Sequence, residues 1–152
     1  HPSLSTFHAD SGDTGISRLQ SQPINLSPTL ITNLDAIIVA THATIKNQET
    51  RKVREIVEIV NFTTGSGAVL NFPFKWNPQN DTFYFKLLSR VFEKIMQRYG
   101  LSQQQLINEF QIRTRIMYEL LRRRIFDYNI VQRIISDYYK NPQAVLKNLG
   151  LM

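Results

Sequence analysis

Apolar and polar residues follow a different period in each half of the chain. As far as residue 86, short runs of apolar and β-branched residues are separated by turn-forming residues, as in strands. From residue 87 onward, apolar residues recur every three or four positions, as in helices that pack along one face. The pattern predicts strands over residues 4–7, 36–40, 52–61, 68–76 and 82–85, helices over 12–19, 29–34 and 87–99, and three more helices that begin near residues 102, 127 and 142.

Two of the predicted strands constrain the sheet. The run Ala36–Ala40 is apolar and rich in β-branched residues, like strands that are covered on both faces. The polar stretch His42–Thr50 predicts a turn after it. In the strand over 52–61, Glu55 and Glu58 are three positions apart, so they cannot both point to one face of a regular strand. We expect one of them to be paired or to lie near an edge.

Capping residues predict where the helices begin and end. Asp10 is the expected N-cap of the first helix, and Ser27 followed by Pro28 begins the second. Ser102 with Gln105 predicts a capping box for the long helix near residue 102. Other predicted caps are Gly100, Asp127, Asn141 and Gly150. In the long helix the residues expected to face inward are Leu106, Phe110, Met117, Leu120 and Leu121.

The formal net charge of +6 is confined to the helical half. Residues 1–86 hold seven basic and seven acidic residues, and residues 87–152 hold eleven basic and five acidic ones. The run Arg122–Arg124 lies at a helix end, where cations complement the helix dipole. The alternative is a contact with an acidic partner or a membrane surface. Because the apolar stripes are needed for packing between helices, we expect the remaining free surface to be charged.

Composition excludes several classes of site. The chain has 152 residues, a length typical of one domain or of one domain with an appendage. It contains no Cys, which excludes disulfides and thiolate metal sites. His1, His8 and His42 do not share the spacing of helical zinc ligands, so no metal site is predicted. No apolar run approaches the length of roughly 18 residues that a membrane span needs.

Aromatic residues are concentrated in the predicted hairpin over residues 68–85. Six aromatic side chains lie on its two strands, and cross-strand pairing explains them without a ligand. Base stacking is the alternative. A second alternative for the whole chain is a nucleic-acid-binding module, because three or four short helices with all the net charge could form a helix-turn-helix.

His8 is the main candidate for chemistry. The first predicted strand ends in His8, Asp10 and Ser11 just before a helix, and ligands of open α/β sheets bind beyond the carboxyl ends of strands. Helix N-termini at such places favour anions, including phosphate. The bland interpretation of His8 is a hydrogen-bonded histidine at a strand end. Thr6 and Ser11 are expected to be structural, through side-chain bonds to the backbone.

The residues around His8 resemble a known motif. The run Ser5–Ser11, followed by Arg18–Leu19 and Pro23–Asn25, resembles the His box of the secretion ATPases. These are the hexameric motors of type II and type IV secretion, type IV pili and archaeal flagella. The archaeal branch is the more similar one, because of Pro23–Asn25 and the later run Arg51–Ile59.

The resemblance implies an α/β fold, namely the C-terminal part of a RecA-like P-loop ATPase domain followed by a β-hairpin and a small helical subdomain. The implied boundaries are residues 1–62 for the core, 63–86 for the hairpin and 87–152 for the helices. His8 would contact the γ-phosphate. Arg18, Arg51 and Arg54 would be nucleotide or subunit-interface contacts, and the alternative for these arginines is surface salt bridges. The cofactors implied are ATP and Mg²⁺.

The resemblance also implies a homohexamer that works at the inner face of the membrane as a peripheral cytoplasmic protein. Its partner would be an integral membrane platform protein, bound through Arg122–Arg124, and no nucleic acid is expected. The chain has no Walker A loop, which in the family lies upstream of the His box. It also begins with His rather than Met, so we expect a fragment that binds ATP weakly and does not hydrolyse it alone.

Overall fold

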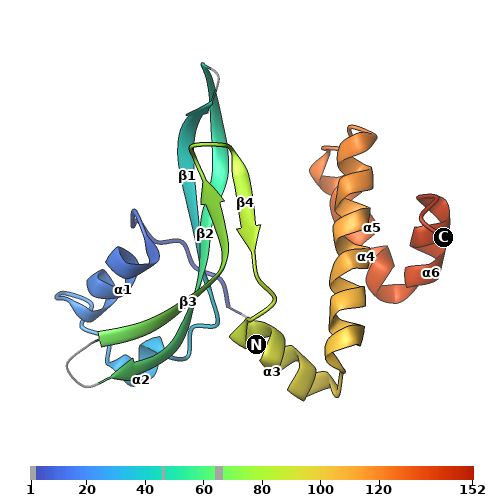
Figure 1. Cartoon of the computed structure of the whole chain (residues 1–152). Helices are drawn as coiled ribbons and strands as arrows, with labels where there is room; N and C mark the ends of the chain where they lie inside the picture. The colour runs from blue at the N-terminus through green and yellow to red at the C-terminus, as the bar shows by residue number, and fades with distance from the viewer. Residues whose placement is uncertain (1–2, 46, 64–66) are drawn as a thin grey trace. The chain divides into compact units, whose positions relative to one another are not determined.

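The computed structural model describes residues 3–45, 47–63 and 67–152, and it divides the chain into two compact units (Figure 1). Residues 1–97 form a unit of mixed helices and strands, and residues 98–152 form a helical unit. The elements of the first unit are α1 (Gly12–Gln20), α2 (Pro28–Ile31), β1 (Ile37–Ile45), β2 (Gln48–Thr63), β3 (Gly67–Asn77), β4 (Thr82–Phe85) and most of α3 (Arg90–Tyr99). Those of the second are α4 (Gln103–Arg122), α5 (Tyr128–Lys140) and α6 (Pro142–Asn148).

The four strands form one antiparallel sheet in the order β1-β2-β3-β4, so each strand pairs with the next along the chain. The expectation that the run Ala36–Ala40 is covered on both faces is wrong. In β1 the buried Val39 stands between exposed neighbours, and Ile38 is 64% exposed. Alternation of this kind is usual in antiparallel sheets with one solvated face.

Two predictions at strand ends also differ from the structure. Residues 3–9 adopt no regular structure, so Leu4–Phe7 is not a buried strand, and Leu4 is fully exposed. The turn predicted over His42–Thr50 is much shorter than expected, because β1 continues to Ile45 and β2 begins at Gln48, with the turn residue Asn47 between them. The β-branched threonines of this stretch suit a pleated surface despite their polarity. The connecting residue 46 lies outside the described residues.

Two shifts in strand register, one on each side of β2, change the directions of the side chains near Glu55 and Glu58. Val39 pairs with Glu55 whereas Ala40 pairs with Val53, so Arg54 has no partner on β1. On the other side, the pairing moves from Ile56–Phe74 to Glu58–Asn71, which leaves an extra residue on β3. Such β-bulges bend a strand and redirect its side chains.

The core of the first unit lies where α1 and α2 cover the sheet. Ile16 of α1, Ile31 of α2 and Ile59 of β2 are buried together. Ser27 is the N-cap of α2 and Pro28 its first residue, as predicted. The N-cap of α1 is Ser11, so the expectation of Asp10 is wrong. Ser11 has the better geometry because its hydroxyl reaches the amide of Thr14.

The aromatic hairpin is confirmed and belongs to the same sheet. β3 and β4 are antiparallel, and β3 also pairs with β2. The rings of Phe74 and Phe83 stack with their centroids 5.3 Å apart, and Trp76 Nε1 donates to Asp81 at 2.8 Å. Cross-strand packing therefore accounts for these rings. The turn predicted over Thr63–Gly67 falls largely on residues 64–66, outside the described residues.

Glu58 sets the start of α3. Its carboxylate is 1% exposed and accepts hydrogen bonds from the Ser89 hydroxyl, the Asn71 amide and the backbone N–H groups of Arg90 and Val91. Burial alone would raise the pKa of the Glu58 carboxyl, but these hydrogen bonds outweigh burial and hold the pKa below its usual value. Because the carboxylate binds the first amides of the helix, α3 begins at Arg90 rather than at residue 87.

The helical unit has the predicted caps. Ser102 and Gln105 form a capping box, Asp127 and Asn141 are N-caps, and Gly100 and Gly150 have positive φ. The core residues are Ile116, Leu120, Tyr138, Val145 and Leu149.

Only some of the α4 residues that were predicted to face inward are buried. Leu106 and Leu120 are buried as expected, but Phe110, Met117 and Leu121 are exposed. The expectation that the helices leave only a charged surface free is therefore wrong.

Candidate functional site around His8

His8 is exposed, and the backbone of residues 8–12 is held by side chains from α1 and β2. The guanidinium of Arg18, in α1, donates to the carbonyl oxygen of His8. Arg54 Nη1, in β2, donates to the carbonyl oxygen of Asp10 at 3.1 Å. Glu55 Oε1 accepts from the backbone N–H of Gly12 at 3.1 Å. The exposed imidazole therefore projects from a segment that is held at His8 and at the residues that follow it.

The bulge in β2 explains how two consecutive residues reach the same segment. In a regular strand, neighbouring side chains point to opposite faces. Here Arg54 is the unpaired residue of the register shift, and both Arg54 and Glu55 contact residues 10–12. Glu55 is 4% exposed, so its carboxylate is a buried group with a specific partner.

The first amides of α1 are occupied from within the protein. The Gly12 amide donates to Glu55, and the Thr14 amide donates to the Ser11 hydroxyl at 3.2 Å. The Thr14 hydroxyl in turn accepts from the Ser11 amide at 2.9 Å, which completes a capping box. Ser11 therefore has the structural role expected of it. The Glu55 carboxylate supplies the negative charge that a helix N-terminus favours, so this end of α1 does not need a phosphate as its counterion.

The structure brings together two of the three candidate arginines. Arg18 and Arg54 both hold the His8 segment. Arg51 lies further along β2, opposite His42 of β1, and is exposed. Within residues 3–45, 47–63 and 67–152, Arg51 forms no hydrogen bond or ion pair with residues 8–12.

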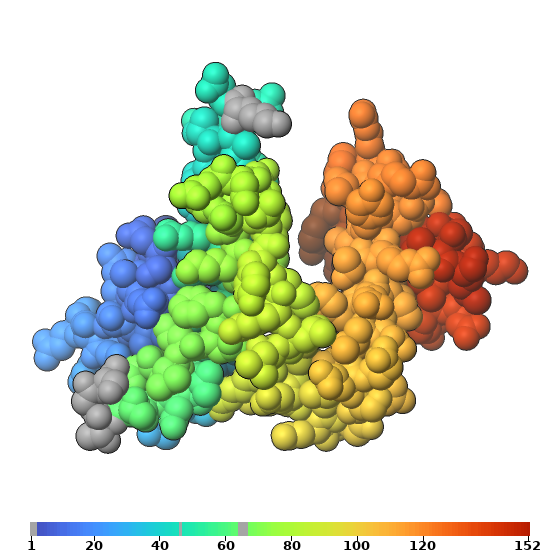
Figure 2. All heavy atoms as spheres, in the orientation of Figure 1, coloured from blue at the N-terminus to red at the C-terminus, as the bar shows by residue number. Residues whose placement is uncertain are grey.

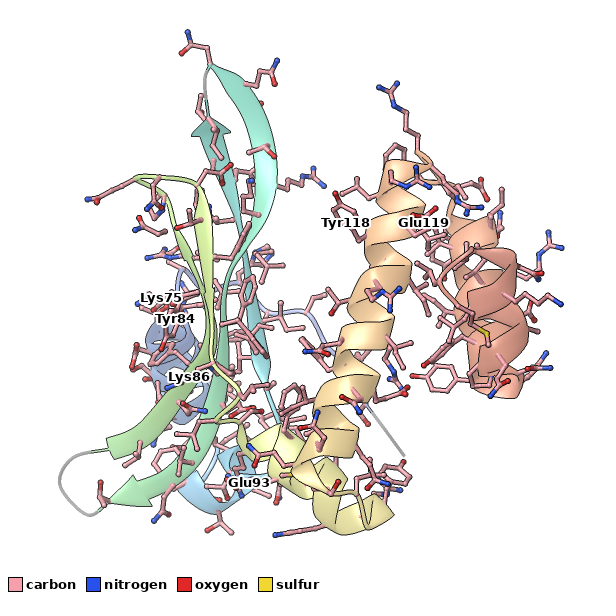
Figure 3. The ribbon with its side chains drawn as sticks, turned by 45° about the vertical axis from the view of Figure 1, so that its right-hand side comes forward. Lys75, Tyr84, Lys86, Glu93, Tyr118 and Glu119 are labelled. Carbon is pink, nitrogen blue, oxygen red and sulfur yellow. The ribbon has the colours of Figure 1, made fainter. Side chains whose placement is uncertain are left out.

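Two hollows lie on the sheet away from His8. One, of about 160 Å³, is lined by His42, Ala43, Thr44 and Glu49. The other, of about 340 Å³, is lined by Lys75, Trp76, Asn77, Pro78 and Tyr84. In Figure 3, Lys75, Tyr84 and Lys86 lie on the same side of the sheet.

The three arginines at the end of α4 are not equivalent. Arg122 and Arg123 both pair with Glu119, with N–O distances of 2.6 Å. Hydrogen bonds from Arg122 and then Arg123 lower the pKa of the Glu119 carboxyl to about 2, against the opposing effect of burial. Arg123 Nη2 also donates to the carbonyl of Leu149 at 2.7 Å, which ties α4 to the end of α6. Arg124 has a positive φ of 55° and ends the helix.

Within residues 3–45, 47–63 and 67–152, no three His, Cys, Asp or Glu side chains lie close enough together to hold a metal ion. His1 lies outside those ranges. Likewise, no helix of the described part of the chain has the length and apolarity to cross a membrane.

Sequence reasoning missed the part that Glu55 plays in the site. The residue was singled out for its spacing from Glu58, but its partner Gly12 is 43 positions away. The available signal was a pair of glutamates, Glu55 and Glu58, at a spacing that a regular strand cannot place on one face. It pointed to a paired carboxylate without identifying the helix N-terminus as the partner.

Comparisons with known proteins give relatives but no family. No protein-family model matches the chain. It is 30% identical over 143 residues to the uncharacterized protein MJ1287 of the archaeon Methanocaldococcus jannaschii, covering 92% of this chain and 53% of that protein. Two further uncharacterized proteins of the same organism are similar: MJ0900 at 33% identity over 145 residues and MJ0781 at 25% over 148 residues. The chain spans 26% and 20% of these two relatives, and about half of MJ1287.

Proposed function

We propose that the chain is the C-terminal part of an archaeal-type secretion ATPase, a motor that couples ATP hydrolysis to protein secretion or filament assembly. The motif Ser5–Ser11 with Arg18–Leu19 and Pro23–Asn25 supports the proposal. Similarity to three longer archaeal proteins is consistent with the archaeal branch, although their names state no activity. In this proposal the first unit completes a RecA-like domain, and ATP and Mg²⁺ are bound mainly by residues upstream of His8.

The observation that carries the proposal is the fixed backbone around His8. A histidine binds a phosphate more tightly when its backbone is already ordered, because less conformational entropy is then lost on binding. Arg18 fixes the carbonyl of His8, and Arg54 and Glu55 fix residues 10–12 after it, so the backbone that carries the imidazole is ordered before any ligand binds. His8 would donate a hydrogen bond to the γ-phosphate oxygen, and so respond to whether ATP or ADP is bound.

The arginines take separate roles in this proposal. Arg18 and Arg54 are positioning residues, because each donates to a backbone carbonyl of the His8 segment. Arg51 is exposed and suits a contact with nucleotide or with a neighbouring subunit of a homohexamer. Arg122–Arg124 would contact the membrane platform protein, mainly through Arg122 and Arg124, since Arg123 is tied to α6. Such a motor would work at the inner face of the membrane.

Steady-state ATP turnover of the full-length protein tests the proposal. His8→Ala should lower turnover roughly 10²-fold, the effect of removing one hydrogen-bond donor from a charged transition state. His42→Ala is the matched control, because His42 is an exposed histidine of the same unit on β1. Circular dichroism should show both variants folded. If both variants hydrolyse ATP at the same rate, His8 has no part in the reaction.

The predicted alternative, a nucleic-acid-binding module, has a separate assay. Binding of duplex DNA with a steep salt dependence, in a protein without ATP turnover, would favour it over the motor.

A further inference from the structure

The helical unit has a second apolar surface that its own core does not use. Five large side chains are exposed between residues 117 and 128, and together they are called the apolar tip: Met117 (51% exposed), Tyr118 (67%), Leu121 (59%), Phe126 (68%) and Tyr128 (74%). They lie in the last turns of α4, in the connection after it and at the start of α5. Exposed fractions of this size are those of protruding side chains, and large exposed apolar patches mark interaction sites.

The backbone keeps these residues at one end of the unit. Met117 and Leu121 are four positions apart and share one face of α4. Figure 3 shows Tyr118 and Glu119 on opposite sides of α4, with Glu119 toward the other helices. The amide of Ile125 donates to the carbonyl of Leu120 at 2.9 Å, so the chain turns back immediately after α4. Phe126 and Tyr128 therefore lie at the same end as Leu121, the end that carries the α4–α5 connection in Figures 1 and 2.

The charge around the apolar tip is positive. The helical unit holds nine basic and four acidic residues, a net charge of +5. Glu119 is turned toward the core and neutralised by Arg122 and Arg123, and the Asp127 carboxylate accepts the Ile130 amide as the cap of α5. Arg122 keeps 64% of its side chain exposed, and Arg124 is exposed beside it.

We propose that the apolar tip docks on an anionic lipid surface. Protruding Leu, Met, Phe and Tyr side chains beside arginines match the interface of a membrane, where apolar groups insert and cations meet the head groups. A second copy of the chain is disfavoured because it would bring two positive ends together. The inference does not rest on the proposed ATPase activity.

Flotation of the chain with lipid vesicles tests the proposal. Mixed vesicles of phosphatidylcholine and phosphatidylglycerol should bind the chain at low salt, and vesicles of phosphatidylcholine alone should bind it far less. Added salt should weaken binding, because it screens charges that are exposed. Wild-type chain that stays unbound with the anionic vesicles at low salt would overturn the proposal.

Matched variants locate the surface. The double variant Leu121→Ser/Phe126→Ser should bind at least about tenfold more weakly, since it removes two apolar side chains that would insert into the interface. Leu88→Ser is the apolar control, because Leu88 is 69% exposed in the first unit. Arg124→Glu should weaken binding several-fold, whereas Lys147→Glu, on α6, should not. Equal losses in variants and controls would show that the apolar tip is not the docking site.

Tryptophan fluorescence gives a second measurement, which remains informative even if the double serine variant does not fold. In Phe126→Trp, the new indole should shift to the blue and be quenched by brominated lipid. The natural Trp76, 8% exposed in the first unit, should not be quenched and serves as the internal reference. An unquenched Trp at position 126 on bound chain would refute the proposal. So would a dimer in sedimentation that the double variant converts to monomer, since it would identify a second copy as the occupant.

Discussion

Gly12→Ala should destabilise the first unit, although the substitution usually favours a helix. Alanine gains up to about 1 kcal/mol over glycine in a helix. However, a Cβ at residue 12 would lie 2.6 Å from Val57 Cγ2 and 3.0 Å from two other carbons of the same side chain. Val57 is fully buried and β-branched, so it has no free rotamer to adopt. Overpacking of this kind costs about 1–3 kcal/mol, and we expect a net loss of about 1–2 kcal/mol.

Gly15→Ala is the matched control in the same helix. There the new Cβ would meet only Ala9 Cβ at 3.5 Å, an ordinary contact. Without a clash the helix propensity remains, so Gly15→Ala should gain up to about 1 kcal/mol.

Urea unfolding followed by tryptophan fluorescence measures both, because the single Trp76 reports on the first unit. Val57→Ala should cost less stability in the Gly12→Ala background than in the natural chain, because there it also relieves the clash. If Gly12→Ala proved as stable as Gly15→Ala, the close approach of α1 to β2 would be wrong.

Two further predictions concern buried carboxylates and their partners. Glu58→Gln should lower the stability of the first unit by about 1–3 kcal/mol, because it replaces one acceptor oxygen by an NH₂ donor and leaves buried donors without a partner. The folded pKa of Glu58 is depressed, so its contribution to the free energy of unfolding is present above the ordinary carboxyl pKa and is lost as the pH falls through the folded pKa. In Glu58→Gln the free energy of unfolding should therefore depend less steeply on pH in the acid range. In the helical unit, Arg123→Glu should lower the melting temperature, whereas Arg124→Glu should leave it nearly unchanged; the reverse order would contradict the tie between Arg123, Glu119 and Leu149.

Local signals in the sequence were sufficient for most of the helices. Capping at Ser27, Ser102 and Asp127 depends on residues within three positions, so it could be predicted without the fold. Met117 and Leu121 were misplaced because α4 is apolar along two faces, and periodicity alone does not say which face meets α5 and α6.

The candidate site depends on contacts that a local pattern does not contain. His8 was identified from its neighbours in sequence, but residues 10–12, which follow it, are held by β2, more than forty positions away. The bulge that aims Arg54 and Glu55 arises from pairing with β1 and has no local signature in either strand. For the same reason Leu4–Phe7 was predicted to be a buried strand. Its composition is typical of a strand, but it pairs with no strand of the described residues, and Leu4 and Phe7 are exposed.

The register shift in β2 also has a consequence for the order of folding. Each strand of the sheet pairs with its neighbour in sequence, so the hairpins can form early, through short chain loops. The contacts of residues 10–12 with Arg54 and Glu55 close loops of 43 and 44 residues, and they exist only once the bulge is in place. The segment that carries His8 should therefore be among the last parts of the first unit to become ordered. A molecule with β2 in the wrong register would keep a sheet but lack a positioned histidine.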